Sequence, residues 1–384
     1  MEIIRAYKTE LKPNNRQRTL FEQFAKTRQF VFNIGLREWQ RQYKRSEKPS
    51  AYGLKKQFNA VKYDYFPHVT STPYAVTEGA FYDLGSAFKN FFRRVKNGEK
   101  EVGYPKEKRY PSGFHLRSTK VERARVRLTG IGWVRLKEKG YIPVNPLKYG
   151  TYVTLSQHAG RWYISVPVYE EIPNPKNDNT LVIGVDFGIK TLAVCSDGTT
   201  FENPKPLRTA QRKLKCLQRE LSRRRKGGAN WRKTRGKIQR CHAHIANIRK
   251  HTLHQISHEI VVNRRPAAIA IENLNVSGMA KNHCLAQAVL DCGFYELRRQ
   301  LEYKAKRHGV KIVIVDRWFP SSKTCSSCGC IKDDLKLSDR VFVCADCGFE
   351  LDRDLNAACN LAALVEPRNT RELPVELGCR EALL

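Results

Sequence analysis

The sequence predicts a mixed α and β chain built of several domains. Its 384 residues exceed the roughly 100 to 200 residues of an ordinary domain. Hydrophobic residues make up 41% and aromatic residues 10%, which is enough for folded cores and excludes a wholly disordered chain. The spacing of apolar residues also changes along the chain, from helical to alternating and then to buried strands between helices. We therefore expect two to four units of different architecture.

The first part of the chain combines helices with alternating strands. Residues 1–12 alternate like a strand, and residues 14–97 repeat apolar positions at helical spacing, as in Phe81, Leu84 and Phe88. We expect these aromatic side chains to form a core, with base stacking as the alternative. Residues 103–171 alternate with a period of two, which indicates a β-barrel or sandwich. If residues 2–10 are its first strand, the helical unit is an insertion.

The second part of the chain has the pattern of an α/β domain. A stretch rich in Pro and Asn, residues 172–180, reads as an interdomain linker. Apolar strands and helices then alternate. The expected elements are strands at 181–186, 191–198, 267–272 and 311–316, a basic helical region at 206–263, and helices at 285–307 and 353–365.

Three acidic residues occupy positions that favour a metal site. Asp186 ends the apolar strand LVIGVD and Glu272 ends AAIAIE, so both can meet at one edge of a sheet. Asp354 begins a helix of small residues that can approach this sheet closely. Carboxylates that are brought together repel one another unless divalent cations bind them, and two such cations can promote phosphodiester cleavage. The order of the acids fits an RNase H-like domain that binds magnesium or manganese.

Other interpretations of these acids stay open. Each carboxylate could instead cap a helix or pair with one of the many arginines. Asp352, Asp316 and Asp291 are rival candidates, and Asp352 is the strongest of them because it lies just before Asp354.

Four cysteines have the spacing of a zinc site. Cys325 and Cys328 form one CxxC pair, Cys344 and Cys347 form another, and 15 residues separate the two pairs. A glycine follows each pair and permits a tight turn, so four thiolates can surround a zinc ion tetrahedrally. Cys330 lies close enough to compete as a ligand. We expect the other cysteines to be small buried apolar residues; they are Cys195, Cys216, Cys241, Cys284, Cys292, Cys359 and Cys379.

The charge of the chain predicts a polyanionic partner. Lys and Arg number 70 against 37 Asp and Glu, a net charge of +33. A membrane surface is one candidate. No run of about 18 apolar residues and no signal-peptide core occurs, however, so we expect nucleic acid as the partner and a cytoplasmic, prokaryotic location.

Positive charge is densest between Pro206 and Ser257, where Glu220 is the only acid. Solvated helices normally mix charges of both signs, so this segment predicts phosphate binding. Three histidines on one predicted helical face, at positions 251, 254 and 258, lack a partner motif for metal. The candidate nucleic-acid contacts are Arg212, Lys213, Arg219, Arg223, Arg224, Arg225, Lys226, Arg232, Lys233, Arg235, Lys237 and Arg240.

The sequence contains the motifs VDFG, IENL, PSSKTCSSCG, CADCG and DRDLNAA. Through these motifs it resembles the TnpB family of transposon-encoded RNA-guided endonucleases, which are related to type V CRISPR effectors. The resemblance is dense over residues 181–361 and weaker in FVFN, AFKNFF and GRWYIS. It implies a RuvC nuclease domain, a zinc-bearing target-nucleic-acid-binding segment, and an oligonucleotide-binding-like wedge barrel with an inserted helical recognition domain. It also implies Asp186, Glu272 and Asp354 as the catalytic, magnesium-binding residues, and Cys325, Cys328, Cys344 and Cys347 as the zinc ligands.

With this resemblance the domains can be assigned. The wedge comprises residues 1–12 and 98–172, the recognition domain 13–97, the linker 173–180, the RuvC domain 181–320 and 349–365, the zinc segment 321–348, and a disordered tail 366–384.

The leading functional hypothesis is RNA-guided cleavage of double-stranded DNA beside a short adjacent motif, with one protein per guide RNA. A strand-joining transposase that uses the same carboxylates is the second hypothesis, and a DNA-binding repressor that does not cut is the third. Nucleotide-binding GxxxxGK[ST] and serine-hydrolase GxSxG motifs are absent, so those two classes have no support.

Overall fold

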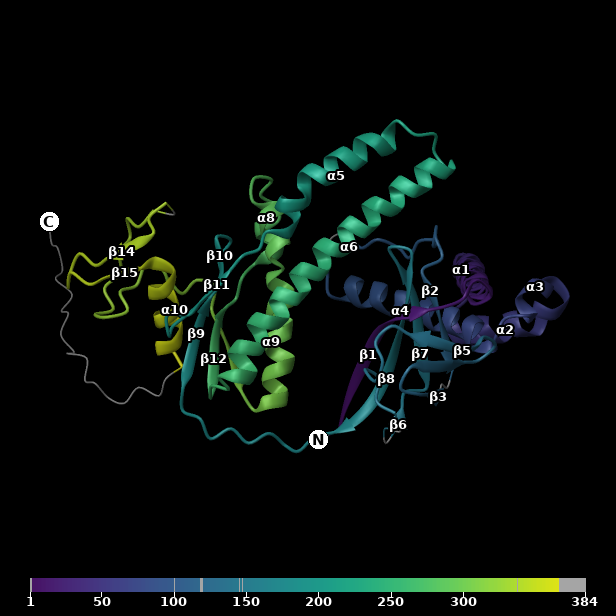
Figure 1. Cartoon of the computed structure of the whole chain (residues 1–384), viewed down its shortest axis with the longest axis horizontal. Coiled ribbons are helices and arrows are strands. Elements are labelled where there is room, and N and C mark those ends of the chain that lie inside the picture. Colours follow the sequence, from purple (N-terminus) through teal and green to yellow (C-terminus); the bar gives the residue numbers. More distant parts are fainter. Residues whose placement is uncertain are drawn as a thin grey trace. The chain divides into compact units, whose positions relative to one another are not determined.

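The structure, a computed structural model, describes residues 2–99, 101–117, 120–144, 146, 148–336 and 338–365. The chain divides into two compact units (Figure 1). Unit 1 comprises Met1–Pro173 and Lys226–Arg240, and unit 2 comprises Asn174–Arg225 and Cys241–Leu384. The predicted disordered tail, residues 366–384, lies outside the described residues. None of the helices in the described part of the chain is both long and apolar enough to span a membrane.

Unit 1 contains an eight-stranded antiparallel sheet that begins with the N-terminal strand. The strands follow the order β2-β7-β8-β1-β5-β4-β3, with β6 paired to β8. No ladder joins β2 to β3 among the described residues, but Leu116 of β2 and Val121 of β3 share one core, so the sheet curls around that core. The strands are β1 (Glu2–Lys12), β2 (Gly113–Arg117), β3 (Lys120–Val121), β4 (Arg125–Leu128), β5 (Gly132–Leu136), β6 (Lys148–Tyr149), β7 (Tyr152–His158) and β8 (Arg161–Glu171).

Four helices lie between β1 and β2. They are α1 (Asn15–Lys44), α2 (Ala51–Tyr65), α3 (Pro67–Thr70) and α4 (Tyr74–Lys96). Phe21, Phe24 and Val76 belong to the core of the sheet, so these helices share part of that core. Farther along α1 a second core forms, in which Trp39 stacks on Phe88 with ring centroids 3.9 Å apart. The buried aromatic residues of this region therefore form cores, as expected.

Unit 2 is built on a five-stranded sheet in the order β11-β10-β9-β12-β13. β9, β12 and β13 are parallel, while β10 runs antiparallel to β9 and β11 antiparallel to β10. The strands are β9 (Val182–Asp186), β10 (Thr191–Cys195), β11 (Thr200–Glu202), β12 (Ala268–Glu272) and β13 (Lys311–Val315).

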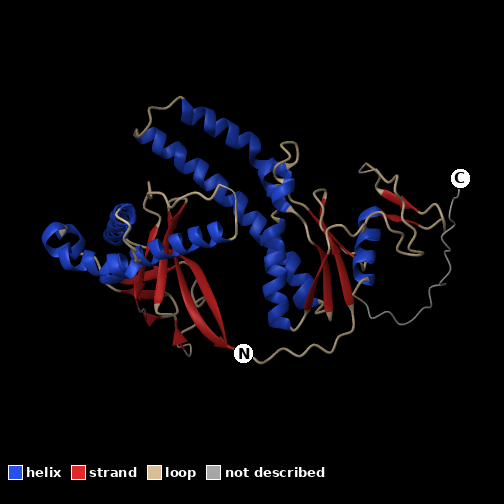
Figure 2. Cartoon of the chain, turned by 180° about the vertical axis from the view of Figure 1, so that it is seen from behind, coloured by secondary structure: helices blue, strands red, loops and turns tan. Residues whose placement is uncertain are grey.

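Helices cover both faces of this sheet (Figure 2). Ile183 and Ile271 share a core with α6 (Ala229–His258) and α9 (Phe294–His308) on one face. Alternate positions such as Ala268 and Ala270 pack against α10 (Arg353–Ala363) on the other face. The sequences of these strands are continuously apolar because both of their faces are buried.

Two predicted helices are interrupted. The basic region consists of α5 (Pro206–Ser222), a turn, and α6, which continues into the π-helix η1 (Glu259–Asn263). Gly227 in the turn has φ +84°, a conformation that side chains disfavour. The expected helix at 285–307 is α8 (Ala286–Cys292) followed by α9, and Gly293 separates them with φ +73°.

Three short elements complete the described part of the chain. They are the helix α7 (Val276–Met279) and the strands β14 (Val341–Val343) and β15 (Glu350–Asp352).

Candidate functional site

The parallel pair β9 and β12 places Asp186 and Glu272 at the same edge of the sheet. Ala268 pairs with Val182, and the register continues in parallel to Ile271 and Val185. Asp186 is the next residue of β9, and Glu272 is the next residue of β12. The two carboxylates therefore end adjacent strands at their carboxyl ends, where α/β sheets bind ligands.

Helix α10 brings Asp354 to this edge because Gly184 lets the helix approach the sheet. A Cβ added at Gly184 would lie 1.9 Å from the Ala358 carbonyl oxygen and 2.6 Å from the Ala362 nitrogen. Ala357 and Ala358 are buried, so the facing side of the helix also consists of small side chains. Asp354 lies in the first turn of the helix. A larger residue at position 184 would displace the helix that carries it.

Burial and neighbouring charge perturb two of the three acids. Burial, together with the negative charges of Asp354 and Glu272, raises the pKa of Asp186 to about 7, although the positive charge of Arg353 opposes the shift. Burial also raises the pKa of Glu272. A carboxyl group whose pKa is raised by neighbouring carboxylates is the situation that a bound cation relieves.

The three carboxylates are near one another but do not form a closed ligand set. Among the described residues, only the four predicted zinc ligands bring three or more candidate ligand atoms within 4.8 Å of one another. Asp354 instead pairs with its neighbour Arg353, whose Nη2 lies 3.1 Å from Asp354 Oδ1. The guanidinium thus supplies a positive charge at the place where the acids converge.

The structure gives each rival acid another role. Asp352 caps α10, since its Oδ1 accepts hydrogen bonds from the backbone N–H groups of Asp354 (3.0 Å) and Leu355 (3.1 Å). Asp316 accepts a hydrogen bond from the N–H of the residue two positions later in a tight turn. Asp291 is buried and forms an ion pair of 2.6 Å with Arg249. These partners favour Asp354 as the third acid.

The four cysteines of the two CxxC pairs form one cluster. Cys325 Sγ lies 3.7 Å from Cys347 Sγ, and Cys328 Sγ lies 3.5 Å from Cys344 Sγ. These separations are much longer than a disulfide bond, and they match the roughly 3.8 Å expected between sulfurs that surround a zinc ion tetrahedrally. Backbone N–H groups of the second knuckle lower the pKa of Cys344, which favours its thiolate form. The cluster therefore indicates a structural zinc site, and Cys330 is not part of it.

Two buried asparagines connect this cluster to helix α10. The Asn356 side chain donates a hydrogen bond to the Thr324 carbonyl (2.7 Å) and accepts one from the Ser326 N–H (2.9 Å). Asn360 donates to the Ser321 carbonyl (2.8 Å) and to the Thr324 carbonyl (2.6 Å). The first cysteine knuckle is thus fixed to the helix that carries Asp354.

The predicted nucleic-acid contacts lie on α5, on the turn after it, and on the first half of α6. Most of these cations are exposed; Arg224 and Arg235 are partly buried. Arg224 forms an ion pair with Glu220. On α5 and the turn, a hollow of about 710 Å³ is lined by Arg212, Lys215, Cys216, Arg219, Glu220, Arg223 and Arg224. The segment Lys226–Arg240 belongs to unit 1, and the rest of the basic region belongs to unit 2.

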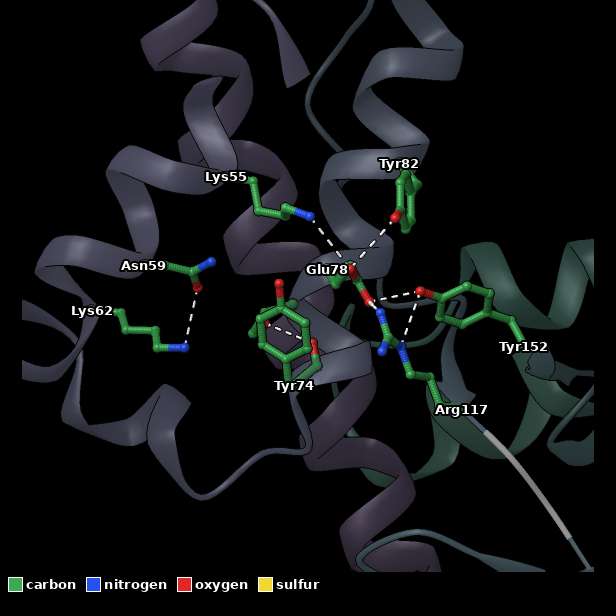
Figure 3. Close-up of polar contacts among 9 residues, drawn as sticks. Lys55, Asn59, Lys62, Tyr74, Glu78, Tyr82, Arg117 and Tyr152 are labelled. Atoms are coloured by element: carbon green, nitrogen blue, oxygen red, sulfur yellow. Dashed lines mark hydrogen bonds and ion pairs between the residues drawn. The ribbon is translucent and has the colours of Figure 1, made fainter. Parts of the chain in front are cut away.

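Sequence reasoning missed a surface of tyrosines and cations in unit 1, here called the tyrosine–lysine surface (Figure 3). Its centre is Glu78, which is 3% exposed. Although burial raises the pKa of Glu78, its hydrogen bonds lower it further than burial raises it. Glu78 accepts hydrogen bonds from Tyr152 (2.7 Å), Arg117 (2.7 Å), Lys55 (3.4 Å) and Tyr82 (3.4 Å).

The cations of this surface lie against exposed aromatic rings. Lys62 Nζ is 5.4 Å and the Arg117 guanidinium 5.8 Å from the ring centre of Tyr74, which is 43% exposed. Lys55 Nζ is 5.6 Å from the ring of Tyr82. The residues come from α2, α4, β2 and β7, so no local sequence pattern could reveal that they gather.

Two expectations about cysteines are wrong. Cys216 and Cys284 are exposed, whereas Cys195, Cys241 and Cys292 are buried as expected. Cys216 lies on a helix face among arginines, and Cys284 lies in a turn, so neither has a core to enter. Cys359 is partly buried, and Cys379 lies outside the described residues.

Comparison with known proteins identifies the family. Residues 165–283 match the OrfB_IS605 family, described as "Probable transposase", and residues 294–361 match "Cas12f1-like, TNB domain". Residues 1–48 match a family described as "Helix-turn-helix domain", but the described residues of this range form one strand and one long helix, β1 and α1.

Two bacterial relatives cover nearly the whole chain. A protein of Escherichia coli K12 named "Putative RNA-guided DNA endonuclease InsQ" is 33% identical over 391 residues, covering 94% of this chain and 92% of the relative. A "Putative RNA-guided DNA endonuclease" of Streptomyces pristinaespiralis is 34% identical over 375 residues, covering 94% of this chain and 89% of the relative. The CRISPR-associated endodeoxyribonuclease Cas12f1 of Sulfoacidibacillus thermotolerans is 25% identical over 216 residues, about half of each chain.

The chain therefore belongs to the OrfB/TnpB family of transposon-encoded proteins. This confirms the family that the motifs predict.

Proposed function

We propose that this chain is an RNA-guided DNA endonuclease that cuts double-stranded DNA beside a short adjacent motif. The observation that carries the proposal is the convergence of Asp186, Glu272 and Asp354 at one sheet edge, in a chain 33% and 34% identical to relatives that bear this name. A protein that only binds DNA has no need for three mutually repelling carboxylates.

The strand order of unit 2 supports an RNase H-like RuvC domain. Strands β9, β12 and β13 are parallel, β10 is antiparallel to β9 and β11 is antiparallel to β10. The acids end two of these strands and begin a helix, in the predicted order of strand Asp, strand Glu and helical Asp. The curled sheet of unit 1 supports the wedge, with the helices between β1 and β2 as its recognition insertion.

The three carboxylates fit divalent metal ions. Oxygen ligands suit Mg²⁺ or Mn²⁺, and a bound cation would remove the repulsion that raises the pKa of Asp186. When bound, such ions activate a water molecule and stabilise the leaving oxygen in phosphodiester hydrolysis. Asp186 and Glu272 hold their carboxylates on rigid adjacent strands. Asp354 is oriented by the Asp352 cap of its helix and by its ion pair with Arg353.

The basic segment and the tyrosine–lysine surface support nucleic-acid partners. Exposed cations, such as those of the basic segment, bind phosphates, and exposed aromatic rings, such as those of the tyrosine–lysine surface, stack with bases. We assign the greater part of the positive charge to binding of the guide RNA. Folded RNA is recognised through its shape and phosphates, while base pairing selects the target.

The strand-joining transposase remains a distinct alternative, because it would use the same carboxylates. It predicts binding of fixed transposon-end DNA without RNA. The non-cleaving repressor predicts DNA binding that is unaffected when the three acids are replaced, with no cutting by the wild-type protein.

The test is to purify the protein with its RNA and supply DNA targets in Mg²⁺ with and without complementarity to that RNA. We expect cutting of the complementary DNA alone. Equal cutting of both targets, or cutting that survives complete removal of RNA, contradicts RNA guidance and favours the transposase. Binding without any cutting favours the repressor.

A further inference from the structure

We propose that a cavity beside Glu272 holds one nucleotide of the DNA strand that is cut. This inference rests on the proposed function. The cavity has a volume of about 290 Å³, and its wall includes Phe187, Glu272, Phe294, Tyr295, Arg298 and Arg317. Ligand pockets in proteins measure roughly 300 to 1,000 Å³. The volume of this cavity is near the lower end of that range and suits a single nucleotide.

The position of the cavity follows from the sheet. Phe187 comes directly after β9, Glu272 ends β12, and Arg317 follows β13, so the carboxyl ends of the three parallel strands all contribute to the wall. The first turn of α9 supplies Phe294 and Tyr295. Because Glu272 is both part of the wall and a proposed metal ligand, an occupant lies directly beside the place of cleavage.

The aromatic residues of the wall suit a base. Phe187 and Phe294 are buried, with ring centroids 6.2 Å apart, and they form an apolar part of the wall. Tyr295 is 73% exposed, which leaves its ring available for stacking. Aromatic rings that nothing covers are the usual stacking platforms for single-stranded nucleic acid.

The two arginines suit the phosphate of the same nucleotide. Arg298 donates hydrogen bonds through Nη1 to Asn273 Oδ1 (3.1 Å) and through Nε to Glu302 Oε1 (2.9 Å). These bonds fix the guanidinium, and its other N–H groups can donate to a phosphate. Arg317 is exposed and has no ion-pair partner among the residues that the structure describes. Glu272 is the only acid among the described residues of the wall. Once Glu272 holds a cation, the cavity is positively charged.

The experiment combines changes in the protein with changes in the DNA. Nucleotides of the cut strand are replaced one at a time by an abasic analogue, and single-turnover cleavage by the RNA-bound protein is measured in Mg²⁺. We expect one position near the cut at which the abasic analogue slows the wild-type protein about tenfold, as the loss of one stacked base would. Tyr295→Ala should slow the intact DNA to a similar extent, and the abasic analogue should then add nothing.

A second measurement does not depend on cleavage. In complexes of the inactive Asp186→Ala protein, 2-aminopurine at the same DNA position should be quenched by stacking. The quenching should be lost with Tyr295→Ala and kept with Tyr295→Phe, which retains the ring. Arg298→Gln should slow cleavage, while Arg299→Gln, a matched change on the same helix at a residue paired with Glu296 outside the cavity, should not.

Three outcomes overturn the inference, and only the last of them also overturns the proposed function. If the wild-type protein cuts RNA-matched DNA and the Tyr295→Ala protein cuts it equally fast, the cavity holds no nucleotide; the same follows if the abasic analogue slows both proteins by the same factor. If the wild-type protein cuts no RNA-matched DNA at all, the proposed function fails, and this inference fails with it.

Discussion

The Asn356 side chain donates a hydrogen bond of 2.7 Å to the backbone carbonyl of Thr324, the residue directly before the first zinc-site cysteine. Asn356 lies on α10, two residues after Asp354, and is fully buried. Together with Asn360, this amide group fixes the first cysteine knuckle to the helix that carries a proposed catalytic acid. Disturbing either of them should disturb the other.

Asn356→Ala should couple the two sites measurably. The change leaves the Thr324 carbonyl with only its bond from Asn360 and the Ser326 N–H without its bond from Asn356, at a cost of about 1 to 3 kcal/mol for a buried polar group without a partner. We expect faster release of zinc to a chromogenic chelator and slower DNA cleavage. Normal zinc release together with normal cleavage would show that the contact has no such role.

The zinc cluster should be required for its segment to fold. Its core among the described residues is small, consisting of Cys325, Phe342 and Cys344 with a few partly buried neighbours. So small a core cannot offset the loss of chain entropy without metal. Elemental analysis should find about one zinc per chain, and Cys325→Ser or Cys344→Ser should lower both zinc content and resistance to proteolysis. Cys216→Ser, at an exposed cysteine outside the cluster, is the matched control and should change neither.

Replacement of the two neighbouring acids of α10 should separate catalysis from helix capping. Asp354→Asn should abolish cleavage while RNA and DNA binding persist, because this acid is proposed to hold metal. Asp352→Ala should instead lower the stability of α10 by about 1 kcal/mol, the usual cost of losing an N-cap, and keep most of the cleavage. The reverse result, with activity lost only on replacement of Asp352, would mean that the third ligand is Asp352.

Asp186→Asn should stabilise the metal-free protein in a pH-dependent way. In the folded protein the pKa of Asp186 is raised from 3.8 to about 7, so the native state holds a proton that the unfolded state has lost between these values. The wild-type protein must then lose stability as the pH rises through this range, and it does not regain that stability above about pH 7. Asparagine at position 186 carries no charge, so the Asp186→Asn protein does not lose this stability.

The measurement is thermal unfolding in the presence of a chelator of divalent ions. The melting temperature of the Asp186→Asn protein minus that of the wild type should increase from about pH 5 to about pH 7 and then remain constant. Adding Mg²⁺ should raise the melting temperature of the wild-type protein and have little effect on Asp186→Asn. A difference that is independent of pH would mean that Asp186 is charged throughout this range.

Neutralising exposed cations of the turn after α5 should weaken binding with a shallower dependence on salt. Arg223, Arg225 and Lys226 are exposed, whereas Arg224 is paired with Glu220, so the first three are replaced by glutamine. The logarithm of the association constant is plotted against the logarithm of the salt concentration. The slope of this plot should decrease in magnitude by about 2 to 3 if each of the three cations contacts a phosphate. Replacing the two arginines by lysine retains the charge and should leave the slope unchanged. Equal slopes for the glutamine and lysine proteins would contradict phosphate contact.

The sequence could predict those parts of the site that depend on local patterns. Asp186 and Glu272 end short apolar strands, and the CxxC spacing restricts the cysteine geometry before any fold is known. The break at Gly227 also had a local signal, because paired glycines interrupt helices. The choice between Asp354 and Asp352 depends on where α10 begins, and a shift of two residues is within the usual uncertainty of a helix boundary.

Other features depend on contacts between residues that are distant in the sequence. The tyrosine–lysine surface joins residues from Lys55 to Tyr152, and the exposure of Cys216 depends on which face of α5 packs against the rest of the unit. The shared core of Phe24 with the sheet of unit 1 likewise appears only when β1 and the later strands are paired. Periodicity identifies which residues are apolar, but it does not show which elements they meet.

The assignment of Lys226–Arg240 to unit 1 has a consequence for how the protein can be cut by proteases. The polypeptide crosses from one unit to the other three times, after Pro173, after Arg225 and after Arg240. A single nick in the segment 173–180 leaves residues 226–240 in the C-terminal fragment, although they pack within unit 1 together with the N-terminal fragment, and the continuous helix α6 joins them to unit 2. Limited proteolysis at the linker should give fragments that separate on a denaturing gel but migrate together in native chromatography.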